Sequence, residues 1–276
     1  MMPKDDFPRA KSIVVMLACT AALIVACKRE APANAPAIAT AQPATASVPV
    51  VLQDQVEHTP TWLLGITYPK GVALPPGLAQ EIKAYADASR KRLVDAAAPH
   101  KAGDAGVPYD MSLEFRQIAP QAQGLIAVAA DGSLYSGGAQ GDPLIRRFLW
   151  NTRSGGLIRA QDLVTGDAGW VAISNSVRET LLGQIRTRME DDKQVPEDIG
   201  KAIARMKPIV EAGTTPAASE FSEFEPMIDA QGKLVGLTFV FPPYQVAGYS
   251  DGIQRADVPV AVFQQYLNPK YRALFE

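Results

Sequence analysis

Apolar and polar positions alternate most clearly over residues 107–116. Tyr109, Met111, Leu113 and Phe115 occupy every second position, and the residues between them are polar. A period of two predicts a strand with one face in a core and the other in water. Other short apolar runs predict strands over residues 61–68, 125–130, 133–136, 144–150, 221–228, 234–241 and 256–260. Asp131-Gly132 and residues 229–232 are expected to be hairpin turns between such strands.

Elsewhere the apolar residues recur every three or four positions. This spacing predicts helices over residues 76–98, 167–189, 196–207 and 262–267. Asp167 is expected to cap the second of these helices, and Pro208 to end the third. Strands grouped around separate helices and joined by short turns indicate an α+β fold, with a mainly antiparallel sheet packed with two to four helices.

The N-terminus has the pattern of a bacterial lipoprotein signal. Basic residues among the first eleven precede a short apolar run that ends at Ala26-Cys27. We expect cleavage before Cys27 and lipidation of its thiol. An uncleaved anchor helix is the alternative, and Cys19 is a second candidate cleavage site, although only about six apolar residues precede it. Lys28 follows the cysteine, where an inner-membrane retention signal more often has Asp, so we expect an outer-membrane lipoprotein facing the periplasm.

Three regions are therefore expected: a signal peptide over residues 1–26, a lipidated Ala/Pro-rich tether over 27–55, and an α+β binding domain over 56–276. Cleavage would leave Cys27 as the single cysteine, so a hydrophobic core rather than an intrachain disulfide must stabilise the domain. No later apolar run reaches about 18 residues, which leaves the lipid as the expected membrane contact. The net charge of −2 argues against a nucleic-acid partner.

Candidates for catalysis are few. His58 and His100 are the only histidines, no G-x-S-x-G elbow is present, and no zinc-binding spacing occurs. Glu223 and Glu225 lie at period two and could be the paired acids of a glycosidase. The hydrated face of an edge strand is the simpler interpretation of this pair, and we favour it. We therefore predict no catalytic residues, no metal site, no cofactor and no enzymatic activity.

Two segments are unusual for a plain structural domain. In the first, Gly137 and Gly138 follow Tyr135 and precede Gln140, and adjacent glycines allow a turn with positive φ. In the second, a predicted strand runs into Pro242-Pro243, which must leave the sheet. The following loop, with Tyr244, Tyr249 and the turn residue Gly252, is a candidate protein-binding surface because tyrosine buries area at little entropic cost. The alternative is that one or both tyrosines fold back onto the core.

The same two segments resemble the extracytoplasmic lysozyme-sensing domain of the RsiV anti-sigma factor family, which is also found beside peptidoglycan deacetylases. Tyr135 to Gln140 is similar to the family's Tyr and Gly-Gly-Ala-His motif, with Gln140 in place of histidine. Residues 150–156, followed by Gln161-Asp162-Leu163, are similar to the family's strand, turn and leucine-aspartate-leucine region, and residues 258–260 are similar to its closing strand. Its distal motif is matched in order and spacing by Phe241, Pro243, Tyr244, Tyr249 and Gly252.

The resemblance implies that the protein binds another protein. Its expected partner is a lysozyme-like hydrolase or a secreted antibacterial toxin, which it would inhibit or confer immunity against. The candidate partner-binding residues are Tyr135, Gln140, Pro243, Tyr244 and Tyr249. The alternatives are a structural lipoprotein that binds peptidoglycan and, less favoured, an enzyme that acts on peptidoglycan through Glu223 and Glu225.

Overall fold

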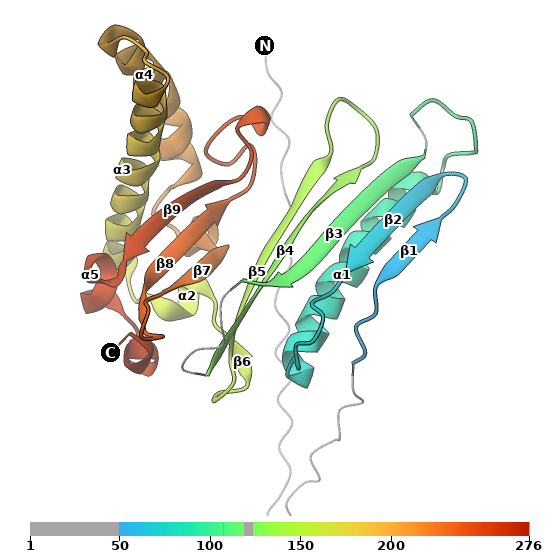
Figure 1. Ribbon diagram of the computed structural model, residues 1–276, viewed down its shortest axis with the longest axis horizontal. Coiled ribbons are helices and arrows are strands. Elements are labelled where there is room, and N and C mark those ends of the chain that lie inside the picture. The colour runs from blue at the N-terminus through green and yellow to red at the C-terminus, as the bar shows by residue number, and fades with distance from the viewer. Residues whose placement is uncertain (1–49, 107, 119–123, 276) are drawn as a thin grey trace, which may run out of the picture. The chain divides into compact units, whose positions relative to one another are not determined.

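The structure is a computed structural model that describes residues 50–106, 108–118 and 124–275, and the chain from Ser47 to Glu276 forms one compact unit (Figure 1). Cys27, the predicted signal peptide and the predicted tether up to residue 49 lie outside the described residues. The predicted α+β class is confirmed, with two sheets rather than one. No helix among the described residues has both the length and the apolar character needed to cross a membrane.

The first sheet has six strands in the order of the chain, and all neighbours are antiparallel except β2 and β3. The parallel pair requires a crossover, which helix α1 (Pro76–Ala97) supplies while it covers one face of the sheet (Figure 1). The strands are β1 (Gln55–His58), β2 (Trp62–Thr67), β3 (Tyr109–Gln117), β4 (Leu125–Tyr135), β5 (Asp142–Asn151) and β6 (Gly156–Leu157).

The second sheet has three antiparallel strands, β7 (Phe224–Ile228), β8 (Leu234–Phe241) and β9 (Gln254–Pro259), with β8 in the middle. Four helices accompany it: α2 (Ala160–Leu163), α3 (Asp167–Asp191), α4 (Pro196–Gly213) and α5 (Val260–Phe263). Short 3-10 turns cover Ala218–Phe221, Tyr249–Asp251, Gln264–Tyr266 and Pro269–Leu274.

Two hydrophobic cores result, and β4 and β5 contribute to both. Val128 and Phe148 pack under α1 in the first core, whereas Ala127 and Leu149 point to the opposite face and join the second core. The second core also contains Trp170 of α3 and the phenylalanines of β7 and β8. Because both cores are made of residues within the compact unit, we expect Ser47–Glu276 to fold on its own.

The predicted turn at Asp131-Gly132 is wrong. Strand β4 runs without interruption through both residues, and the β4–β5 turn lies at residues 136–141. Gly132 is required in the strand because a Cβ there would lie 2.1 Å from the carbonyl oxygen of Ser112 on β3. The glycine therefore permits a close approach of two backbones rather than a reversal of the chain.

Three smaller predictions also need correction. Gly166, not Asp167, is the N-cap of α3, and Asp167 lies in the first turn. Helix α4 continues through Pro208 to Gly213. Pro208 and Ala204 are both exposed, so water can bond to the carbonyl that the missing proline N–H leaves free. Finally, β7 begins at Phe224, because residues 218–221 form a 3-10 turn.

Candidate functional site

The connection between β8 and β9 leaves the sheet at Pro242 and turns sharply. The N–H of Gln245 donates to the carbonyl of Pro242 (3.2 Å), and the N–H of Tyr244 donates to the carbonyl of Ala247 (3.1 Å). Tyr244 adopts a φ of +75°, which side chains other than glycine rarely accept. The turn thus holds a bulky residue in a strained conformation at its tip.

This loop is anchored from beneath. The side-chain amide of Gln245 donates to the carbonyls of Gly213 (3.0 Å) and Glu220 (2.9 Å). Gly213 allows this approach, since a Cβ there would lie 1.8 Å from the carbonyl oxygen of Gln245. Val246 is buried in the second core, whereas Tyr244 is 60% exposed. The contacts fix the base of the loop and leave its tip in solvent.

Three of the predicted partner-binding residues meet at this tip. The hydroxyl of Tyr244 donates to Oε1 of Gln140, 104 residues away in the β4–β5 loop. The ring of Tyr249 lies 5.4 Å from that of Tyr244, at an angle of 39°. Tyr249 is half-buried and opens the 3-10 turn that ends at Gly252, whose φ is +67°. Tyr244 is therefore exposed, as expected for a residue on a binding surface, whereas Tyr249 is partly buried.

Tyr135 has a different environment. Its hydroxyl donates to the carbonyl of Gly138 (3.1 Å), and its ring packs edge-on against Tyr109 at 6.4 Å. Gly137 and Gly138 both have a φ of +95°, as the turn prediction required. Tyr135 thus shapes the loop that presents Gln140. Pro243 is half-buried and directly precedes Tyr244.

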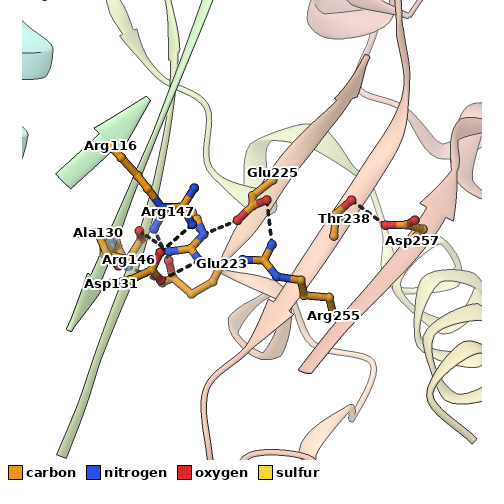
Figure 2. Close-up of polar contacts among 10 residues, drawn as sticks. All are labelled: Arg116, Ala130, Asp131, Arg146, Arg147, Glu223, Glu225, Thr238, Arg255 and Asp257. Carbon is orange, nitrogen blue, oxygen red and sulfur yellow. Dashed lines mark hydrogen bonds and ion pairs between the residues drawn. The ribbon is translucent and has the colours of Figure 1, made fainter. Parts of the chain in front are cut away.

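A network of charged residues connects the two sheets (Figure 2). Its centre is Arg147 of β5, whose side chain is 1% exposed. Arg147 donates to Glu225 through Nε (2.6 Å), to Asp131 through Nη2 (2.8 Å) and to two backbone carbonyls through Nη1. Arg116 and Arg255 each bind one of the two carboxylates from the outer side. Each nitrogen of the buried guanidinium therefore has at least one acceptor, as a buried charge requires.

Glu223 belongs to the same network and joins the second sheet to the edge of the first. One oxygen accepts from Arg146 Nη1 (2.8 Å), and the other accepts from the backbone N–H of Arg147 (2.6 Å). At Arg147, β5 has no neighbouring strand on the side away from β4. The carboxylate of Glu223 therefore supplies the hydrogen-bond partner that a strand would otherwise provide for this N–H. Tyr85 of α1 lies nearby: burial, and secondarily the charge of Glu223, raises the pKa of Tyr85 to about 12.

The hydrated edge strand expected for Glu223 and Glu225 is wrong. Both side chains are largely buried, and each of their carboxylate oxygens accepts from an arginine group. A glycosidase acid must reach the glycosidic oxygen, and its partner must reach the sugar or a water molecule. The pair instead bridges the two sheets.

Sequence reasoning did not identify Arg147 and Asp131 as members of this network, although it named Asp131 as part of a turn. The signal available was the pair Arg146-Arg147 inside the apolar run Leu144–Trp150, because charged residues are atypical of a buried strand unless they are paired. Over the described ranges, no group of three His, Cys, Asp or Glu side chains is placed to hold a metal ion.

Comparisons with known proteins show a shared fold. No family model and no curated protein matches the sequence. The structure is similar to the crystal structure of a DUF3298 family protein from Pseudomonas aeruginosa PAO1, with 16% identity and a TM-score of 0.51 over 81% of this chain and 93% of that chain. A DUF3298 family member from Bacteroides fragilis has 18% identity and a TM-score of 0.43, with 72% of each chain covered. The first of these two DUF3298 proteins therefore shares its fold with this chain.

Proposed function

We propose that this chain is a periplasmic lipoprotein, anchored through Cys27 to the outer membrane, that binds and neutralises a cell-envelope hydrolase. The partner is a lysozyme-like enzyme or a secreted antibacterial toxin. Two lines of support come from outside the site: the lipoprotein pattern at the N-terminus, and the resemblance of the loop motifs to the lysozyme-sensing domain of the RsiV family. The fold shared with a DUF3298 protein is compatible with that resemblance.

One observation carries the proposal, namely the conformation of Tyr244. A tyrosine at a φ of +75° is costly to maintain, and the loop nevertheless keeps it with its ring in solvent. Such strain persists only where surrounding contacts over-determine it, which the bonds of Gln245 and Gln140 do here. A rigid, exposed aromatic side chain beside a second tyrosine has the properties of an anchor residue in a protein interface.

The direct test is binding and inhibition. Purified Ser47–Glu276 is titrated by calorimetry with lysozymes of several structural classes and with hydrolases or toxins encoded beside its gene, and their activity on cell walls is measured in parallel. We expect one of them to bind and to lose activity. If none of these enzymes binds or is inhibited, the proposal fails.

The role of the surface is tested with a matched pair of variants. Tyr244→Ala is expected to weaken binding by about 30-fold or more, the effect of losing an interface anchor. Val195→Ala, another exposed apolar residue in the turn before α4, is the control and is expected to bind normally. Equal affinities of the two variants would place the binding surface elsewhere.

The anchor is tested separately. In cells, the full chain is expected to incorporate a labelled fatty acid and to fractionate with the outer membrane, and Cys27→Ala is expected to abolish the label. Two further arms address the alternatives. Retention of the protein on washed insoluble peptidoglycan without hydrolase binding would favour a structural lipoprotein, and peptidoglycan turnover that is lost in Glu223→Gln would favour an enzyme.

A further inference from the structure

A pocket of about 250 Å³ lies between α3, α4 and the loop that follows Pro243. The two helices lie side by side (Figure 1). Eight of its twelve lining residues are apolar, among them Leu181, Ile185, Met189, Met206, Val210 and Val246, although polar groups contribute almost as much of the lining surface as apolar ones. Ligand sites for drug-sized molecules span roughly 300–1,000 Å³, so this pocket suits a smaller apolar group.

Two arginines complete the lining, Arg188 from α3 and Arg205 from α4. Both are exposed, and across the described residues neither side chain donates a hydrogen bond or forms an ion pair. The arginines of the network between the sheets, by contrast, are all paired. Two unpaired guanidinium groups from neighbouring helices therefore stand over one apolar pocket.

The acidic group at the pocket does not cancel this charge. Asp251 also lines it, but its carboxylate accepts the N–H of Gly248 (3.0 Å) and closes the 3-10 turn of its own loop. Gln254 donates to the carbonyl of Asp251 (2.6 Å). The lining thus has two free cations against one carboxylate that is already bonded, which leaves an excess positive charge for an anionic group.

We propose that this pocket binds an amphipathic anion, with an apolar chain between α3 and α4 and a carboxylate or phosphate group held by Arg188 and Arg205. The guanidinium fork matches both head groups in geometry. At roughly 30 Å³ for a group the size of water, the pocket has room for a chain of about eight carbons. Val246 and Ala247 line the pocket within the loop of Tyr244, so a bound chain would brace the base of that loop.

Calorimetry on purified Ser47–Glu276 tests this with three probes that share an eight-carbon chain: octanoate, octyl phosphate and octyltrimethylammonium. We expect saturable binding of one or both anions and no saturable binding of the cation. In NMR spectra, the bound anion is expected to shift the amide resonances of Val246 and Ala247. Comparing the two anions identifies the preferred head group. If neither anion binds, or if the cation binds as well as the anions, the proposal is overturned.

Variants locate the site. Arg188→Gln and Arg205→Gln are each expected to lower the affinity about tenfold, the effect of losing one charge-assisted hydrogen bond. Arg186→Gln, on the same helix but outside this pocket, is the control and should bind normally. Ala202→Leu places a larger side chain in the pocket and should exclude the ligand, with its fold checked by thermal unfolding. Unchanged affinity in both arginine variants would refute the site, whatever the outcome of hydrolase binding.

Discussion

Arg147 shows how a single residue can link two sheets. Its guanidinium binds Asp131 of the first sheet and Glu225 of the second, and both carboxylates keep a further arginine on their outer side. The group is thus a buried cation between two anions. Removing one of these groups leaves its partners as unpaired charges in the protein interior, and the resulting loss of folding free energy exceeds the stabilisation that the intact network provides.

We therefore expect Arg147→Met to destabilise the protein by about 3 kcal/mol, measured by urea unfolding. Arg116→Met is the control: it breaks an ion pair to the same Asp131, but its side chain is 46% exposed, and we expect a loss of about 0.5 kcal/mol. Similar losses in the two variants would contradict the central position of Arg147.

Gly132 gives a second prediction at this scale. A methyl group at this position would meet the backbone of β3, which has no room to yield, so Gly132→Ala is expected to destabilise by about 2 kcal/mol. Gly65→Ala on β2 tests the reverse case, because open space surrounds the position of its Cβ and its φ is not positive. There the substitution is expected to be neutral or slightly stabilising in thermal unfolding. Equal effects would show that Gly132 has no special role.

Asp131 and Gly132 also show the limit of what local sequence information can predict. Asp-Gly between apolar runs usually indicates a hairpin turn. Here Asp131 instead binds Arg147, and Gly132 allows β3 to approach closely. Both reasons lie in partners that are distant in the sequence. The positive φ of the adjacent Gly137 and Gly138, by contrast, followed from local chemistry and was predicted correctly, and Gly252, predicted as a turn residue, also has a positive φ.

At the scale of elements, strong periodicity located most of the fold. Helix α1, helix α3 and strands β2, β3 and β8 lie close to their predicted bounds, because an apolar stripe records which face is buried. Helix α4 was cut short at Pro208, where the exposed position of the proline lowers its cost. Strand β1 was missed as an element, because its single apolar residue, Val56, is exposed, and Glu57 is held by an ion pair to Arg90.

This ion pair makes β1 sensitive to acid. Arg90 of α1 binds Glu57 through two hydrogen bonds of 2.8 and 2.7 Å, and this pairing lowers the pKa of Glu57 below its ordinary value of 4.5. The stabilisation is complete above the unfolded pKa and is lost as the pH falls through the lower folded value. Asp54, which accepts the N–H of Tyr68, has a lowered pKa for the same kind of reason and acts in the same direction.

Glu57→Gln is accordingly expected to destabilise by about 0.5 kcal/mol at neutral pH, a small effect because the pair is partly exposed. The difference from the unchanged protein should shrink as the pH falls below the unfolded pKa of Glu57, and it should vanish once the pH is low enough to protonate Glu57 in the folded state as well. Urea unfolding across this range measures it, with Glu81→Gln at an exposed position of α1 as the control. A difference that persists in acid would rule out Arg90 as its source.

At the scale of the whole molecule, the loop surface and the pocket depend on tertiary structure. Gln140 and Tyr244 are in contact although 104 residues separate them in the sequence. Val246 lines the pocket beside α3 and α4 because the chain folds to bring them together. The sequence predicted both loops as unusual, because glycine pairs and proline pairs are local signals. It could not predict which of their side chains meet, since this is set by how β4, β5 and β8 are arranged.

The sharing of β4 and β5 by both cores leads to a prediction about unfolding. Phe148 and Leu149 are consecutive, yet the first packs under α1 and the second against the other core. Neither core can lose these strands without exposing the other, so native-state hydrogen exchange should give the same global unfolding free energy for the amides of Phe115 and Phe239. Leu149→Ala should lower both values equally, by about 3 kcal/mol, although its contacts lie in the second core. A decrease confined to Phe239 would show instead that the two cores unfold independently.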